Sequence, residues 1–213
     1  MKALMSEISR TKEPRTAPPE ARRKQLIEAT ITAISKHGIA GTTLTKVTQE
    51  AGLSLGLANF HFDSKDALLT ATLQHLADEH RALWIDKSRQ PDLSAAAKLQ
   101  AIVNAQFHPK VCNRRKLSVW FAFFGDTPHR SAYLRTSGEL DRERQRVTAD
   151  LCARIIGERG YTIVSPNQVS HMLEGLFDGL WLNILMYPDL FDRNTARDQV
   201  NAYLAQCLKE DFL

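Results

Sequence analysis

The sequence predicts an all-α protein with three short helices, a bridging fourth helix and about five longer ones. Apolar residues recur with a helical period along most of the chain, and no convincing run of alternating apolar and polar residues indicates a strand. Gly38, Gly52 and Gly160 stand where periodic segments stop, as do Pro91 and Pro188. With 43% apolar and 24% charged residues among 213, a folded protein with a sizeable core is expected.

Cysteine usage and hydropathy favour a cytoplasmic protein. The three cysteines, Cys112, Cys152 and Cys207, are scattered and odd in number, which argues against a disulfide framework and gives no metal signature. Residues 1–20 contain no apolar run of signal-peptide length, and no stretch reaches the length of a membrane span.

The first residues form a basic segment, and residues 1–18 are predicted to be a flexible basic arm. Seven basic and three acidic residues fall within residues 1–25, a surplus equal to the net charge of +4 of the whole chain. A basic arm beside a folded unit is typical of nucleic-acid-binding proteins. A solvated tail without a partner explains the charge equally well.

The first three helices are short. Residues 22–37 form the first helix, a second follows Thr43 and ends at Gly52, and Ser54 caps a third over residues 55–61. Two helices joined by a tight turn that contains glycine are typical of the helix-turn-helix motif, whose second helix enters the DNA major groove.

The composition of the third helix fits that role. Gly56 and Ala58 are small enough to let the backbone approach base edges, Asn59 can offer an amide to a base, and His61 a ring nitrogen to a base or phosphate. At the start of the second helix, backbone N–H groups and threonine hydroxyls suit a phosphate. The predicted DNA-binding residues are Thr43, Thr45, Ser54, Leu55, Gly56, Asn59, Phe60, His61 and Lys65.

The later helices are longer. Ser64 caps the bridging helix, predicted over residues 65–89, and Asp66 in its first turn suits the helix dipole. Five more helices are predicted over residues 94–108, 117–124, 130–158, 166–186 and 194–209. The helix over 166–186 is apolar on two sides, so it must be covered by its own bundle and by a partner. Within 130–158, alternating arginines and acids, including Arg142 and Arg144, indicate a solvated face.

Residues 42–69 resemble the DNA-binding signature of the TetR family of repressors. The shared features are the threonines, an A-G-L-S turn, a glycine two residues later and the ending FHFDSKDALL. Further segments, among them RRKQLIEAT, KLQAIVNAQF, VWFAFFGDTPH and FDGLWL, resemble the choline-responsive repressors of this family in the same order. The resemblance implies a helix-turn-helix DNA-binding domain over residues 19–64 and a helical ligand-binding and dimerisation domain over 65–213.

It also implies how such a protein would work. The family's members bind a palindromic double-stranded operator as a homodimer through the last two long helices, and a small-molecule inducer changes the separation of the two reading heads. Three positions depart from the family pattern: Leu55 stands where a polar or basic residue is usual, and Asn59 and Phe60 replace a Tyr-Tyr pair. Leu55 can contact a thymine methyl group instead, so we expect a different operator sequence.

A choline-like cation gives a chemical test for the effector site. A quaternary ammonium group donates no hydrogen bond, so aromatic faces and a carboxylate must recognise it. Asp178 is notable because it interrupts an apolar helix, and a buried carboxylate needs a partner. The candidate ligand-binding residues are Trp120, Phe123, Phe124, Tyr133, Asp126, Phe177, Asp178 and Trp181. Aromatics at helical spacing also occur in plain cores, and a hydrophobic or aromatic effector stays the alternative.

No catalytic or cofactor motif is visible. His75 and His80 fall on different faces of a helix, and the chain has no H-E-x-x-H pattern, so no metal site is expected. A phosphate loop, a nucleophile elbow and a dinucleotide fingerprint are also missing from the sequence, which predicts neither an enzyme nor a cofactor.

Overall fold

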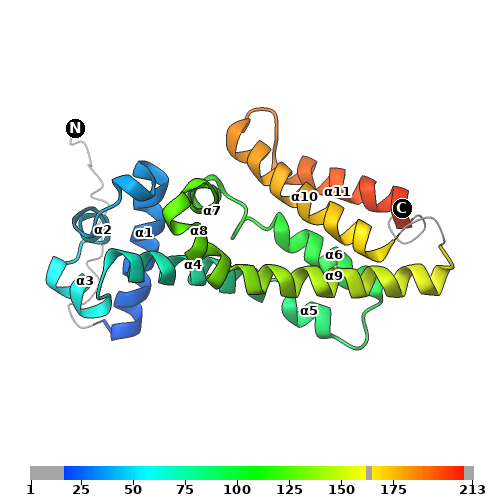
Figure 1. Cartoon of the computed structure of the whole chain (residues 1–213), viewed down its shortest axis with the longest axis horizontal. Coiled ribbons are helices and arrows are strands. Elements are labelled where there is room, and N and C mark those ends of the chain that lie inside the picture. Colours follow the sequence, from blue (N-terminus) through cyan, green and yellow to red (C-terminus); the bar gives the residue numbers. More distant parts are fainter. Residues whose placement is uncertain (1–16, 162–164, 209–213) are drawn as a thin grey trace, which may run out of the picture.

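The computed structural model describes residues 17–161 and 165–208, and these form eleven α-helices and no strand (Figure 1). In chain order the helices are α1 (Pro19–Gly41), α2 (Leu44–Ala51), α3 (Leu55–His61), α4 (Lys65–Ala82), α5 (Ile85–Arg89), α6 (Ala95–Gln106), α7 (Arg114–Gly125), α8 (Thr127–Thr136), α9 (Gly138–Arg159), α10 (Pro166–Met186) and α11 (Arg193–Leu208). The predicted arm lies outside the described residues except for its last two positions.

Helices α1, α2 and α3 gather at one end of the molecule, and α4 runs from them into the second part (Figure 1). Serine and threonine side chains cap these short helices as the sequence predicts. The hydroxyl of Thr43 accepts a hydrogen bond from the Lys46 amide, and that of Ser54 accepts one from Leu57. The predicted stop at Gly38 is a kink with a φ of 68°, after which α1 continues to Gly41.

The predicted bounds of two helices are wrong, because each predicted range contains two helices in the structure. The fourth helix was expected to reach residue 89, but α4 ends at Ala82, and α5 follows after a turn at Leu83 and Trp84. Trp84 is 1% exposed, and burying its large indole outweighs the few hydrogen bonds that a continuous helix would add. The helix expected over 130–158 is split into α8 and α9 at Ser137, which is buried.

The second part of the chain is a bundle in which α9 lies beside α6 and α10, with α11 packed on α10 (Figure 1). Between this bundle and the first three helices lie α7 and α8, and α7 packs against α1. One continuous set of buried apolar side chains runs from Leu26 in α1 to Leu208 in α11. None of the helices in the described ranges combines the length and apolarity needed to cross a bilayer.

Candidate DNA-binding surface and effector cavity

The turn between α2 and α3 presents one face of α3 to solvent. Gly52 ends α2 in the left-handed conformation (φ 66°, ψ 30°), which a residue with a side chain rarely adopts. The Leu53 amide then donates a hydrogen bond of 2.9 Å to the carbonyl of Thr48, which closes the turn. Because Ser54 caps the next helix at once, only two residues separate Gly52 from the start of α3, which holds α3 close to the end of α2.

The predicted DNA-binding residues lie on the surface of this unit. Exposed positions are Thr43, Thr45, Ser54, Leu55, Gly56, Asn59 and Phe60, and half-buried ones are His61 and Lys65. The expectation that Ala58 lies at the DNA-facing surface is wrong, because this residue is fully buried and packs into the core. At Gly56, by contrast, a Cβ atom would meet no other atom within 4 Å, so the surface there is open. Contact between these residues and DNA stays a prediction.

Two lysines are bound to the end of α1. Lys65 Nζ donates a hydrogen bond of 2.8 Å to the carbonyl oxygen of Ile39. Lys46 Nζ donates one of 2.7 Å to the carbonyl oxygen of Gly41. Both ammonium groups therefore complement the negative end of the α1 dipole. If Lys65 bound a DNA phosphate, as the sequence predicts, its ammonium group would contact both the phosphate and the Ile39 carbonyl.

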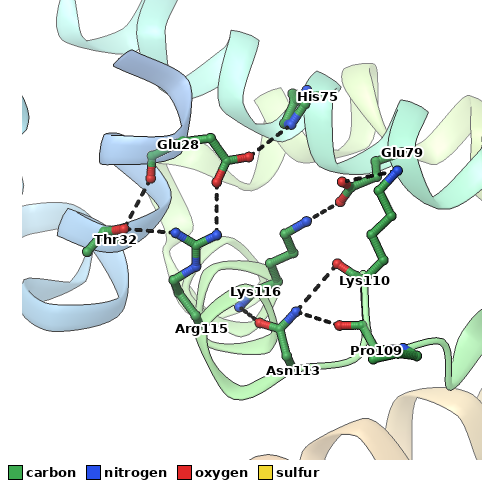
Figure 2. A network of polar contacts seen from close by, with 9 residues as sticks. All are labelled: Glu28, Thr32, His75, Glu79, Pro109, Lys110, Asn113, Arg115 and Lys116. Atoms are coloured by element: carbon green, nitrogen blue, oxygen red, sulfur yellow. Dashed lines mark hydrogen bonds and ion pairs between the residues drawn. The ribbon is translucent and has the colours of Figure 1, made fainter. Parts of the chain in front are cut away.

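A polar network connects α7 to α1 and α4 (Figure 2). Arg115 places Nη2 2.8 Å from Oε2 of Glu28, and its Nη1 donates 3.0 Å to the hydroxyl of Thr32. Nε2 of His75 lies 3.4 Å from the other oxygen of Glu28. The contact with His75, together with the Arg115 guanidinium, lowers the pKa of Glu28 to about 2 against the opposing effect of burial.

A second ion pair lies deeper in the same network. Lys116 is 5% exposed and its ammonium group contacts the carboxylate of Glu79 on α4, while Lys110 lies 3.8 Å from that carboxylate at the surface (Figure 2). A third contact joins α8 to the first turn of α4, where Nε2 of His129 lies 3.5 Å from Asp66. The α7–α8 unit is thus attached to both α1 and α4.

The same unit forms part of a cavity of about 220 Å³. Six helices contribute to its wall: α4, α6, α7, α8, α9 and α10. The lining residues are His80, Gln106, Trp120, Phe124, Tyr133, Asp141, Arg142, Arg144, Gln145, Glu174, Asp178 and Trp181. This volume is below the roughly 300–1,000 Å³ of pockets for drug-sized molecules, so the cavity suits a smaller ligand.

Four aromatic rings form a connected group on the wall. The ring centroids of Trp120 and Trp181 are 6.4 Å apart, those of Trp120 and Tyr133 6.1 Å, and those of Tyr133 and Phe124 4.7 Å. The indole N–H of Trp181 donates 2.9 Å to the backbone carbonyl of Gln106, which fixes the ring against α6. The wall therefore offers several aromatic faces whose positions are set by packing.

Most charges on the wall neutralise one another. The guanidinium of Arg144 is buried and forms two hydrogen bonds with Glu174, of 2.5 and 3.2 Å, and a third, of 3.2 Å, with Asp141. Tyr133 donates its hydroxyl proton to Asp141 at 2.8 Å. The prediction of a solvated face is therefore wrong for Arg144, because α9 is covered on this side by α10.

Among the described residues of the wall, the charged side chains of Arg142 and Asp178 lie outside this network. Within the described ranges the Asp178 carboxylate makes no hydrogen bond and no ion pair, and the residue is exposed at the cavity wall, so the expectation of a buried carboxylate is wrong. Desolvation by the surrounding helices raises the pKa of Asp178 to about 6. His80 on α4 also lines the cavity, and burial lowers its pKa to about 3, so its imidazole is neutral at physiological pH.

The structure brings together only part of the predicted ligand set. Trp120, Phe124, Tyr133, Asp178 and Trp181 line the cavity, whereas three other candidates lie outside it. Phe123 packs on the ring of His129, and Phe177 packs on Phe107. Asp126 contacts His129. Sequence reasoning missed the polar half of the wall, and its one signal was the dense charge pattern of α9. Binding of any ligand by these residues stays a prediction.

Comparison with known protein families agrees with this architecture. Residues 26–72 match the model of the bacterial regulatory proteins of the tetR family, and residues 95–209 match that of the C-terminal part of BetI-type transcriptional repressors. The chain belongs to the TetR family. As a TetR-family regulator it binds DNA through its helix-turn-helix, and the predicted all-α class and family resemblance are confirmed.

Similar proteins support the same assignment. The regulator BetI of Paraburkholderia phymatum is 33% identical over 90% of this chain and 95% of its own length, and that of Paraburkholderia xenovorans is 32% identical over the same shares. A transcriptional regulator from Pseudomonas aeruginosa PAO1 has a TM-score of 0.76 at 27% identity, covering 89% of this TetR-family chain and 91% of its own.

A more distant TetR-like fold has been solved with a bound ligand. The transcriptional regulator from Saccharomonospora viridis, in complex with choline, has a TM-score of 0.68 at 16% identity and covers 87% of this chain and 96% of its own. At that identity the likeness shows the fold alone. The comparisons together make the chain a transcriptional repressor of the TetR family with a BetI-type C-terminal domain.

Proposed function

We propose that this repressor acts as a homodimer on a palindromic operator and responds to a small quaternary ammonium compound of the choline type. The main support for a cationic ligand is the carboxylate of Asp178, which forms no ion pair and lies on the same cavity wall as the aromatic rings. The division into a DNA-binding domain over 19–64 and a ligand-binding domain over 65–213 belongs to the same proposal.

The charge balance of the cavity supports a cationic ligand. Asp141 and Glu174 are both bound to Arg144, and Asp178 forms no ion pair in the described structure, so the three acids of the wall outnumber its two arginines, Arg142 and Arg144. A cation at the aromatic faces would neutralise Asp178 and gain roughly 0.5–2 kcal/mol from each cation–π contact. A neutral hydrophobic effector would instead desolvate Asp178 further without compensation, which is costly.

The homodimer is supported by the outer surface of α10 and the turn after it. Met172, Leu182 and Met186 are 54%, 42% and 58% exposed, and Leu190 is 78% exposed. Met172, Leu182 and Met186 lie on the outer surface of α10, whose other side buries Phe177 and Trp181 in the bundle, and Leu190 lies in the turn that follows. Large exposed apolar groups clustered on one surface are typical of a protein–protein interface. A two-fold dimer through α10 and α11 would present two copies of α3 to two half-sites.

Helix α7 offers a route from the cavity to DNA. Trp120 and Phe124 line the cavity on its second half, and Arg115 on its first turn binds α1. A cation that prefers one position of α7 would shift the populations of two arrangements of α1 and α4, by no more than its preference. The separation of the two copies of α3 would change with them.

Calorimetry with choline, betaine aldehyde and 3,3-dimethylbutan-1-ol, the neutral isostere of choline, tests the ligand class. We expect choline to bind at least about tenfold more tightly than the isostere, equivalent to roughly 1.4 kcal/mol. Equal binding of the isostere would favour the hydrophobic-effector alternative. No binding of either cation would refute a choline-type effector.

A further inference from the structure

The exposed face of α3 has an unusual composition for a DNA-reading helix. Leu55 is 45% exposed and Phe60 77% exposed, and Gly56 and Asn59 lie on the surface between them. In a helix, residues four apart are neighbours, so Leu55 lies beside Asn59 and Gly56 beside Phe60. Leu55 and Asn59 therefore share one stripe of the exposed surface, and Gly56 and Phe60 form the stripe next to it.

The opposite face of α3 is used for packing. Ala58 is fully buried there and Leu57 is half-buried, so α3 cannot turn its apolar side chains inward without losing this contact. The ring of Phe60 meets that of His61 edge-on, with centroids 5.1 Å apart. The sequence of the helix, LGLANFH, contains no Arg, Lys, Asp or Glu.

This set of side chains matches one kind of base pair. The C5-methyl of thymine is the apolar group that bases present in the major groove, and asparagine pairs in a bidentate manner with N6 and N7 of adenine. Guanine is read mainly by Arg or Lys, and the amino group of cytosine by Asp or Glu, all of which α3 lacks. Leu55, Phe60 and Asn59 together therefore suit adenine and thymine.

We infer that α3 reads an A·T-rich core in each operator half-site, with Leu55 and Phe60 on thymine methyl groups and Asn59 on adenine. The inference rests on the proposed function, in which α3 enters the major groove. It adds the base composition of the half-site and the chemical group that each side chain recognises.

The test starts with selection of binding sequences from a random double-stranded DNA library by the full chain. In the selected duplex, each thymine of a half-site is then replaced in turn by deoxyuridine, which lacks only the methyl group. Affinity is measured by fluorescence anisotropy at fixed salt, because phosphate contacts make it salt-dependent. We expect about three- to fivefold weaker binding at each of two thymines per half-site, the value of one buried methyl-sized group.

Variants assign the contacts. Leu55→Ala should abolish the deoxyuridine effect at one thymine and Phe60→Ala at the other, while Asn59→Ala should relax the preference for one adenine. Leu134→Ala truncates a leucine that is 56% exposed on α8, away from α3, and should leave both effects intact. Circular dichroism checks that each variant is folded.

The outcomes separate this inference from the proposed function. A selected half-site with a G·C-rich core, or binding that is insensitive to deoxyuridine in the unsubstituted protein, overturns the reading of thymine while leaving the repressor intact. A selection that enriches no palindromic sequence overturns the proposed mode of DNA binding itself.

Discussion

Arg115 on α7 and Glu28 on α1 form an ion pair in which Nη2 and Oε2 are 2.8 Å apart. This pair joins the helix that supplies Trp120 to the cavity with the first helix of the DNA-binding part. It is partly exposed, so its contribution to stability is modest, but its position between two functional parts makes it a candidate for coupling them.

Replacing Glu28 with Gln is expected to weaken this coupling. Choline should bind the variant with nearly unchanged affinity, because Glu28 is not on the cavity wall. The change in DNA affinity caused by choline should become at least severalfold smaller. Calorimetry and anisotropy measure the two quantities separately.

Lys36→Gln provides the matched control, because it breaks a 2.8 Å ion pair with Glu50 that does not involve α7. The control should keep the full response to choline. An unchanged response in Glu28→Gln, or the same loss in both variants, would exclude a coupling role for the Arg115–Glu28 pair.

Asp178→Asn is expected to weaken choline binding about tenfold at pH 8. The pKa of Asp178 is raised to about 6, so in the unsubstituted protein the carboxylate loses its charge as the pH falls below that value. Choline affinity should therefore decrease between pH 7 and pH 5, and the variant should lack this decrease. Calorimetry over this range measures both effects. Asp126→Asn, which changes an acid outside the cavity, should retain the unsubstituted pH profile.

His80 and Asp178 should act in opposite directions on stability between pH 7 and pH 5. The pKa of His80 is about 3 in the folded protein and about 6.5 when unfolded, so the unfolded chain takes up the proton and the free energy of unfolding falls below pH 6.5. At pH 5 the loss is about 2 kcal/mol. The raised pKa of Asp178 has the reverse effect, because its folded form is protonated first as the pH falls.

Asp178→Asn removes the opposing effect of Asp178, so the effect of His80 on the free energy of unfolding can be measured alone. Urea unfolding of this variant at pH 7 and pH 5 should show the full loss of stability, whereas the unsubstituted protein should change less. Equal pH dependence in the two proteins would contradict the raised pKa of Asp178.

Local sequence signals accounted for the first three helices, and long-range packing accounted for what was missed. Ser54, Ser64 and Gly52 determine helix ends through bonds within a few residues, so their effect is visible in the sequence. The turn at Trp84 depends on burial of its indole by distant segments.

The cavity shows the same division. Its aromatic residues were proposed from the chemistry of the ligand that the family resemblance implied, and the same reasoning also proposed Phe123 and Phe177, which lie outside the cavity. Arg144 could not be placed there, because an arginine among acids on one helix looks the same whether water or α10 covers it.

The buried pair of Lys116 and Glu79 leads to the last prediction, which concerns stability. Glu79→Gln should lower the free energy of unfolding by about 3 kcal/mol, because it leaves a charged ammonium group buried without its partner. Lys116→Met should cost less, since the carboxylate of Glu79 keeps Lys110 within 3.8 Å. Lys110→Met removes an exposed lysine near the same carboxylate and should change stability by no more than about 0.5 kcal/mol. Urea unfolding of the three variants at pH 7 measures the order. If Lys116→Met proved as destabilising as Glu79→Gln, Lys110 would not compensate the carboxylate of Glu79, and the expected order would be wrong.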